Sequence, residues 1–141
     1  MSGTTMSRPP FRVNRISLRP GCREEIRRWA AETNARSAEV EETLRAEGIQ
    51  LELVLFEERD EGDSLYFVMQ TGDYQRAVDI FMASTRPVDI AHRAFLERIR
   101  QDSHPLEVLA CHYADGDGDS GGHREGGDGE PAPTAASGSG R

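Results

Sequence analysis

The chain has 141 residues, enough for one domain, and it carries a formal net charge of −8. All 17 basic residues are arginine, so Schiff-base catalysis by a lysine is excluded. A chain this acidic lacks the positive surface that nucleic acids and anionic membranes attract. We therefore expect neither nucleic acid nor a membrane as a partner.

The composition divides the chain into a folded body and two polar ends. Residues 1–10 are polar and end in two prolines, which predicts a disordered lead-in. Residues 115–141 are rich in Gly, Asp, Ser and Pro and contain six acidic residues against two arginines. Such a segment cannot offset its ordering entropy by burial. We expect a single domain over 11–114, followed by an acidic disordered tail.

Cysteine content and hydropathy favour a cytoplasmic protein. Cys22 and Cys111 are the two cysteines, too few for a disulfide scaffold or a thiolate-only zinc site. The first residues lack the apolar run of a signal peptide, and no stretch approaches 18 apolar residues. We expect reduced thiols and no membrane span.

The first predicted elements are a strand, a long helix and a hairpin. Residues 11–18 read as a strand, and a period of three and four over 22–47 predicts one helix that ends at Gly48. The runs 49–59 and 65–70 predict the two strands of a hairpin.

Both faces of this hairpin carry apolar residues. Strict alternation predicts one mostly buried face, made of Ile49, Leu51, Leu53, Leu55, Leu65, Phe67 and Met69. Val54 and Phe56 make the opposite face apolar as well. We therefore expect a second subunit to cover the sheet face that points away from the helices.

The last predicted elements are a pair of helices and a strand. Asp73 is the expected N-cap of a helix that runs to residue 83, a second helix follows over 88–101, and 106–113 is the last strand. The order is that of the ferredoxin-like class. We expect an α+β fold, βαββαβ with an extra helix before the last strand, and a four-stranded antiparallel sheet.

A motif at the second helix of that pair points to a family. It reads Ser-x-x-Pro-hydrophobic-Asp-x-x-His-x-x-Phe and consists of Ser84, Pro87, Val88, Asp89, His92 and Phe95. With this stretch and this element order, residues 11–113 resemble a little-characterised bacterial family of the dimeric α/β-barrel superfamily. A histidine often precedes the proline in that family, whereas this sequence has Arg86.

The resemblance implies a homodimer whose two sheets face each other, with a pocket between each sheet and its helices. The superfamily includes cofactor-free monooxygenases of antibiotic biosynthesis, polyketide cyclases, haem-degrading enzymes and stress proteins without known activity. The fold alone therefore does not select a reaction.

Three residues are candidates for catalysis. Asp89 and His92 lie three apart on the predicted helix and share one face, so the carboxylate would orient the imidazole and make His92 a general base. Tyr66, on the hairpin, would supply a phenol as acid or donor. The alternative for each is structural, with Asp89 as a first-turn helix acid, His92 at the rim of the core and Tyr66 packed in the sheet.

Four residues are candidates for substrate binding. Trp29, Thr33 and Ser37 lie on the inner stripe of the long helix, where an indole and small hydroxyls would line a pocket. His112 lies at the inner edge of the predicted last strand. Core packing is the alternative for Trp29, and hydrogen bonds back to the helix carbonyls are the alternative for the two hydroxyls.

No strong metal or cofactor motif is present. His92, His104 and His112 lack the close spacing of a zinc site, although haem ligation by one histidine stays open. The acidic run that begins at Asp115 starts like a calcium loop but lacks its glycine and its final glutamate. No nucleotide-binding motif occurs, so we expect no metal and no cofactor.

These features favour a cofactor-independent enzyme of secondary-metabolite, polyketide-like biosynthesis that acts on a small molecule by proton transfer, as a cyclase, isomerase or dehydratase. One alternative is a cofactor-free monooxygenase of the antibiotic-biosynthesis type. The other is a non-catalytic dimer that binds a small ligand.

Overall fold

The computed structural model describes residues 8–115. The chain divides into one unit up to Leu109 and a second unit from Ala110 onward. The elements of the first unit are β1 (Phe11–Leu18), α1 (Arg23–Ala35), α2 (Ser37–Glu47), β2 (Ile49–Glu57), β3 (Ser64–Thr71), α3 (Tyr74–Ala83), α4 (Pro87–Ile99) and β4 (Arg100–Leu106). Residues 1–7 of the predicted lead-in and residues 116–141 of the predicted acidic tail lie outside the described residues.

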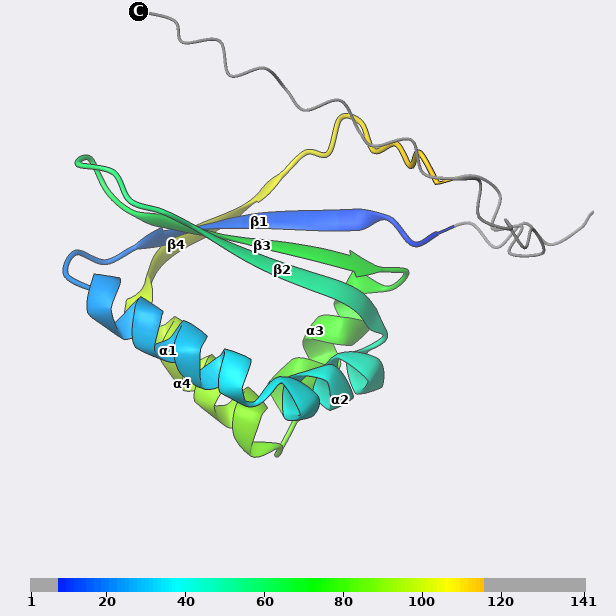
Figure 1. Cartoon of the computed structure of the whole chain (residues 1–141), viewed down its shortest axis with the longest axis horizontal. Helices are drawn as coiled ribbons and strands as arrows, with labels where there is room; N and C mark the ends of the chain where they lie inside the picture. Colours follow the sequence, from blue (N-terminus) through cyan, green and yellow to red (C-terminus); the bar gives the residue numbers. More distant parts are fainter. Residues whose placement is uncertain (1–7, 116–141) are drawn as a thin grey trace, which may run out of the picture. The chain divides into compact units, whose positions relative to one another are not determined.

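The first unit has two layers (Figure 1). The strands form one antiparallel sheet in the order β2-β3-β1-β4, and the helices lie together on one of its faces. The fold is α+β, and its element order is that of the ferredoxin-like class, as predicted. Within residues 8–115 no helix is both long and apolar enough to cross a membrane.

The core lies between the helix-side face of the sheet and the helices. Its buried residues are Ile16, Leu18, Ile26, Leu65, Phe67, Phe95 and Ile99. The Trp29 indole stacks on the Phe95 ring, with centroids 4.5 Å apart and planes 3° apart. Burial of such side chains contributes about 1.5–3 kcal/mol each and holds the helices on the sheet.

The predicted long helix is two helices, because the chain breaks at Arg36. This residue has φ −111° and ψ 34°, outside the helical region, and its N–H bonds the Thr33 carbonyl in a tightened last turn. Asn34 and Ser37 on either side are weak helix formers. The break changes which side chains of α2 face the sheet. The end at Gly48 is as predicted, with the left-handed φ of 75° that favours glycine.

A bulge at Gln50 makes part of the predicted hairpin face wrong. Ile49 pairs with Thr71 but Leu51 pairs with Gln70, so Gln50 is an extra residue in β2. An extra residue moves every following side chain to the other face of the sheet.

The consequence is that β2 exposes its leucines. Leu51, Leu53 and Leu55 are 43%, 47% and 48% exposed, whereas Val54 and Phe56 pack against the core. The rest of the predicted hairpin face is correct, because Ile49, Leu65 and Phe67 are buried and Met69 packs against the core.

The predicted last strand is also wrong, since α4 ends at Ile99 and β4 occupies Arg100–Leu106. The prediction followed the apolar residues after Leu106, but β4 is an exposed, polar edge strand that pairs with β1 alone. Edge strands are often polar and tolerate a proline such as Pro105.

Candidate functional site

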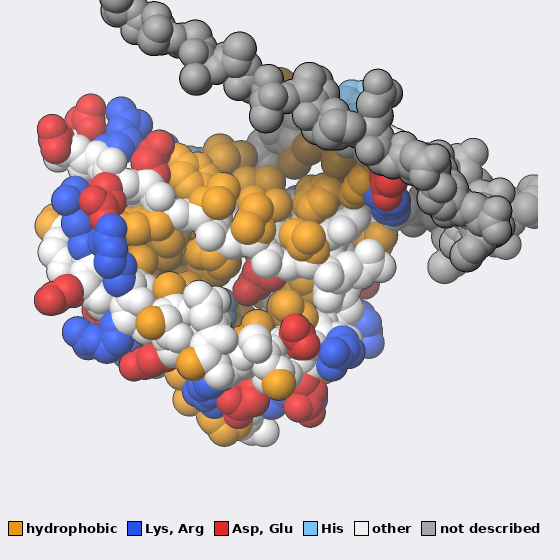
Figure 2. All heavy atoms as spheres, viewed as in Figure 1, with side chains coloured by type: hydrophobic (Ala, Val, Ile, Leu, Met, Phe, Trp, Pro, Cys, Tyr) orange, Lys and Arg blue, Asp and Glu red, His pale blue; other side chains and the backbone are white. Residues whose placement is uncertain are grey.

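A cavity of about 650 Å³ lies between the sheet and the helices. Figure 2 shows the hollow from the side of β2, with hydrophobic side chains gathered along the sheet and charged side chains spread over the helices. The apolar lining comes from both layers and includes Ile16, Trp29, Val40, Leu44, Ile49, Phe67, Met69, Phe81 and Leu96. The cavity is large enough for a small organic molecule.

His92 points into this cavity from α4 and lies among aromatic rings. Its ring centroid is 5.1 Å from Trp29, 5.7 Å from Phe67 and 5.1 Å from Phe81. Its Nε2 atom is buried and has no hydrogen-bond partner within residues 8–115. Burial lowers the pKa of His92 to about 4, against the opposing effect of the Asp89 charge, so the imidazole is neutral at neutral pH.

Thr43 joins two buried carboxyl groups from different helices. Its Oγ1 lies 2.5 Å from Oδ2 of Asp89 on α4 and 3.2 Å from Oε1 of Glu47, one turn further along α2. A hydroxyl has one hydrogen, so Thr43 cannot donate fully to both groups. A proton on Glu47 removes this competition, because the carboxyl O–H then donates to the Thr43 oxygen.

The environment of Glu47 favours that proton. Burial raises the pKa of Glu47 to about 7, and the Asp89 charge adds to the effect, while the Thr43 hydrogen bond and the Arg86 charge oppose it. Glu47 is 5% exposed and Asp89 is 2% exposed, so both groups belong to the interior.

Glu52 brings a third carboxyl to the cavity from β2. It lies on the same face of the strand as Val54, toward the helices, because of the bulge at Gln50. Burial, and then the Asp89 charge, raises the pKa of Glu52 to about 7. No hydrogen bond or ion pair of its carboxyl is found among the described residues.

Asn14, Tyr74 and Arg93 also line the cavity, with their polar atoms bound to other groups. Asn14 Nδ2 donates to the Tyr74 hydroxyl at 3.0 Å. The Arg93 guanidinium donates to the carbonyls of Phe81 at 2.6 Å and Ser84 at 2.9 Å. Arg93 therefore donates these hydrogen bonds to the end of α3 and the α3–α4 turn, and none found among residues 8–115 runs to the acids.

The motif residues divide into a turn and a buried helix face. The Ser84 hydroxyl accepts from the Arg86 N–H at 3.2 Å and Pro87 occupies the first turn of α4, so both shape the turn. Asp89, His92 and Phe95 follow at three-residue spacing on the inner side of α4. The motif thus supplies one acid, one imidazole and one core ring.

The fold brings some of the predicted site residues together in the cavity. Asp89, His92, Trp29 and Thr33 line one cavity. The Asp89 carboxylate accepts a hydrogen bond from Thr43 and none links it to His92, so the predicted orienting contact within this pair of residues is absent.

Three predicted site residues lie elsewhere. Tyr66 is on the outer face of β3, where its hydroxyl donates to Glu57 at 3.1 Å. Ser37 is exposed beyond the helix break. His112 belongs to the second unit and to no strand, because the last strand ends at Leu106.

Sequence reasoning missed Thr43, Glu47 and Glu52. Glu47 stands near the end of a helix full of Arg and Glu, which is typical of a solvated surface. The position of Glu52 could have been predicted from the sequence. Glu52, Val54 and Phe56 lie two residues apart on one strand, so a strand that buries Val54 and Phe56 also turns Glu52 inward.

The site offers proton-transfer groups and apolar walls. Two carboxyl groups have pKa values near neutrality, and a neutral imidazole adds a further donor or acceptor. Among residues 8–115 no group of three or more His, Cys, Asp or Glu side chains is placed to hold a metal ion.

Comparisons with known proteins give a family. No match is found among curated proteins. Residues 10–114, most of the chain and the whole of the sheet and helices, match one family along their length. The chain therefore belongs to a family of unknown function, DUF6176.

Proposed function

We propose that this protein is a cofactor-independent enzyme that moves protons on a small organic molecule held in the cavity. The observation that carries the proposal is the pair of carboxyl groups, Glu47 and Glu52, whose pKa values of about 7 match the requirement for acid–base work at neutral pH. Each group is present in both protonation states near that pH, so one can accept a proton while the other donates one.

In this mechanism Glu52 is the base and Glu47 is the acid. The Glu52 carboxylate, which has no hydrogen-bond or ion-pair partner within residues 8–115, removes a proton from a C–H bond next to a carbonyl group. Glu47 gives a proton to the carbonyl oxygen, and the protons return to other positions as the enol rearranges. No electrons leave the substrate, so the reaction class is isomerisation, cyclisation or dehydration.

His92 has a different role from the predicted one. With a pKa of about 4, the imidazole is a weaker base at neutral pH than either glutamate. We assign it to orientation of the substrate, through Nε2 and through its contacts with Trp29 and Phe81.

The second candidate is the non-catalytic ligand-binding protein. It uses the same cavity and differs in that no carboxyl takes a proton from the ligand. The monooxygenase alternative has less support, because a phenolate substrate would be repelled by the acids of the cavity.

A chromogenic probe separates catalysis from binding. 5-Nitrobenzisoxazole opens to a coloured phenolate when a base removes its one acidic C–H proton. We expect the wild-type chain to accelerate this opening, with a rate that rises through a pH of about 7, and Glu52→Gln to lower it by about 10²-fold or more.

The matched control is Glu41→Gln, which removes the same charge from the exposed side of α2 and should leave the rate unchanged. Circular dichroism verifies that each variant is folded. Equal rates for the wild type and Glu52→Gln would overturn the proposal and favour the binding protein.

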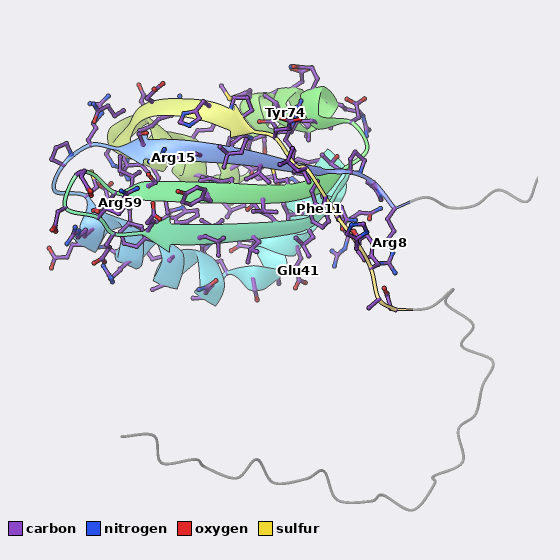
Figure 3. The ribbon with its side chains drawn as sticks, turned by 90° about the horizontal axis from the view of Figure 1, so that it is seen from above. Arg8, Phe11, Arg15, Glu41, Arg59 and Tyr74 are labelled. Atoms are coloured by element: carbon purple, nitrogen blue, oxygen red, sulfur yellow. The ribbon has the colours of Figure 1, made fainter. Side chains whose placement is uncertain are left out.

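We also propose that two copies pair through the outer face of the sheet, seen from above in Figure 3. The cross-strand register sets side chains of this face in transverse rows. One row is apolar from edge to edge: Leu53, Val68, Val13 and Leu106. The last row toward the hairpin is polar: Glu57, Ser64, Ser17 and Asp102.

A second copy is the cover that this pattern favours. Between the two rows lie Leu55, Tyr66, Arg15 and His104. A face that carries acids, bases and an apolar row is self-complementary under a two-fold axis, since the basic groups of one copy can meet the acids of the other. Exposed apolar patches of this kind mark interaction surfaces.

A further inference from the structure

The acids of the cavity differ from the other acids of the fold in having no basic partner. On the surface Glu25, Glu39 and Asp63 are ion-paired with arginines, at 2.6–2.7 Å. None of the ion pairs found among residues 8–115 includes Glu47, Glu52 or Asp89. In a chain with 17 arginines, these three acids of the cavity have no ion pair among the described residues, although the Arg86 charge acts on Glu47 from a distance.

These three carboxyls converge from three elements on one cavity. Glu47 comes from α2, Glu52 from β2 and Asp89 from α4, and all three line the hollow. Buried carboxyl groups are costly unless they are paired or hydrogen-bonded. Thr43 offers one hydrogen to two of them, so the cluster has fewer hydrogen-bond donors than its carboxyl groups can accept from.

Two polar groups of the cavity have no hydrogen-bond partner among residues 8–115. They are the Glu52 carboxyl and the buried Nε2 of His92. Nε2 of a neutral imidazole accepts a hydrogen bond when the other ring nitrogen carries the proton. Both groups without a partner can therefore accept hydrogen bonds from a ligand.

The rest of the wall is apolar and aromatic. Trp29, Phe67 and Phe81 surround the His92 ring at centroid distances of 5.1–5.7 Å. Aromatic faces attract cations and bury apolar groups. A ligand that suits these walls has an apolar, preferably aromatic, body.

We propose that the cavity binds an organic ammonium ion, with its charged nitrogen against Glu52, on the side of Glu47 and Asp89, and its apolar body against Trp29, Phe67 and Phe81. An ammonium group has up to three N–H donors and no acceptor, which matches a cluster rich in acceptors. The inference names the ligand class of the proposed active site and rests on that proposal for the site's role.

Binding of such a cation should be linked to pH. The charged and titratable groups around Glu47 and Glu52 are Asp89, His92, Arg93 and Glu97 of α4, Arg86 at its start, and Arg100 of β4. From the other walls, α1 and β1 contribute Trp29, Thr33 and Asn14, and α3 contributes the Tyr74 phenol. Because the cation favours the ionised carboxylates, its affinity should rise from pH 6 to pH 8 and its binding should release protons.

Three ligands that share a phenyl ring and differ in the charge of their terminal group test whether the cavity prefers a cation. 2-Phenylethylammonium, 2-phenylethanol and phenylacetate are titrated into the full chain by calorimetry at pH 8. We expect the ammonium ion to bind at least about ten times more tightly than the alcohol, and the phenylacetate anion to bind most weakly. Glu52→Gln should remove most of the preference, and the surface control Glu41→Gln should keep it.

The outcomes separate this inference from the proposed function. Equal or tighter binding of the alcohol, or binding of none of the three, would overturn the cation site. Tight ammonium binding without 5-nitrobenzisoxazole opening would keep the cation site and remove the enzyme. Ring opening with no preference for the ammonium ion would keep the enzyme and overturn the cation site. If both proposals hold, 2-phenylethylammonium inhibits the ring opening competitively.

Discussion

The two faces of the sheet contrast most clearly along β2. On the outer face the strand exposes Leu51, Leu53 and Leu55, and on the face toward the helices it places Glu52 beside the apolar Val54 and Phe56. A usual amphipathic strand would do the opposite and send its leucines inward and its acid to solvent. One strand thus carries three leucines to the surface and an acid to the interior.

Both departures have the same physical meaning. The exposed leucines leave apolar surface in contact with water, and the enclosed Glu52 has no hydrogen-bond donor or ion-pair partner among residues 8–115. Under the two proposals, a second copy covers the outer face and a cationic ligand binds at the inner one. Breaking each face separately should therefore change different properties of the protein.

The largest expected effect is on the outer face. Leu53→Arg places a charge in the apolar row and should raise the dissociation constant of the dimer by about 10²-fold or more, since each leucine that is buried contributes about 1.5–3 kcal/mol. At micromolar concentrations, the molar mass from light scattering should be that of a dimer for the wild type and that of a monomer for Leu53→Arg. Ile90→Arg, at an exposed apolar residue of α4, is the control and should stay dimeric. A monomeric wild-type chain would contradict the pairing.

The inner face should respond to pH. The folded pKa of Glu47 and Glu52 is about 7, above the 4.5 of a free glutamate, so the folded state keeps protons that the unfolded chain has lost. Their contribution to stability is present at low pH and is lost as the pH rises through about 7. Relative to the wild type, the double variant Glu47→Gln/Glu52→Gln should gain stability between pH 5 and pH 8, on the order of 2–3 kcal/mol per carboxyl.

Comparison of variant with wild type is needed because His92 acts in the other direction. Its folded pKa of about 4 lies below the ordinary 6.5, so its contribution is present at high pH and is lost as the pH falls. Denaturant unfolding at each pH measures the difference, and Glu41→Gln serves as the reference for a surface acid. A difference that is constant from pH 5 to pH 8 would show that the two carboxyls titrate normally.

The fold was largely predictable because its main signals are local. The helix N-cap at Asp73 and the glycine end of α2 at Gly48 depend on a few neighbouring residues. The predictions were wrong where one irregular residue changes the direction in which all the following side chains of its helix or strand point. Arg36 and Gln50 have no distinctive sequence signal, yet the first divides the predicted helix and the second reverses the faces of β2.

The site was less predictable, since it depends on contacts between distant elements. Asp89 and His92 were found because their spacing within one helix is visible in the sequence. The link between Thr43 and Asp89 spans 46 positions, and no local pattern reports it. Tyr66 was misplaced because alternation shows which residues share a face but not which face meets the helices.

Thr43→Val should have a moderate effect on the inner face. The change keeps the shape of the side chain but removes the hydroxyl that lies 2.5 Å from Asp89 Oδ2, so the buried Asp89 carboxyl loses this hydrogen-bond donor. We expect a loss of about 1–3 kcal/mol in the free energy of unfolding. Thr33→Val is the control, since Thr33 lines the same cavity and no side-chain hydrogen bond of it is found among the described residues. Equal losses would mean that the Thr43 bond adds nothing.

The smallest expected effect concerns Tyr66, whose hydroxyl lies on the outer face. Tyr66→Phe removes its hydrogen bond to Glu57, which both side chains can replace with water, so the free energy of unfolding should fall by about 1 kcal/mol or less. Because the phenol lies on the opposite side of the sheet from His92, the opening of 5-nitrobenzisoxazole and the binding of 2-phenylethylammonium should match the wild type. A drop in either would show that the outer face communicates with the cavity and that the two faces are not independent.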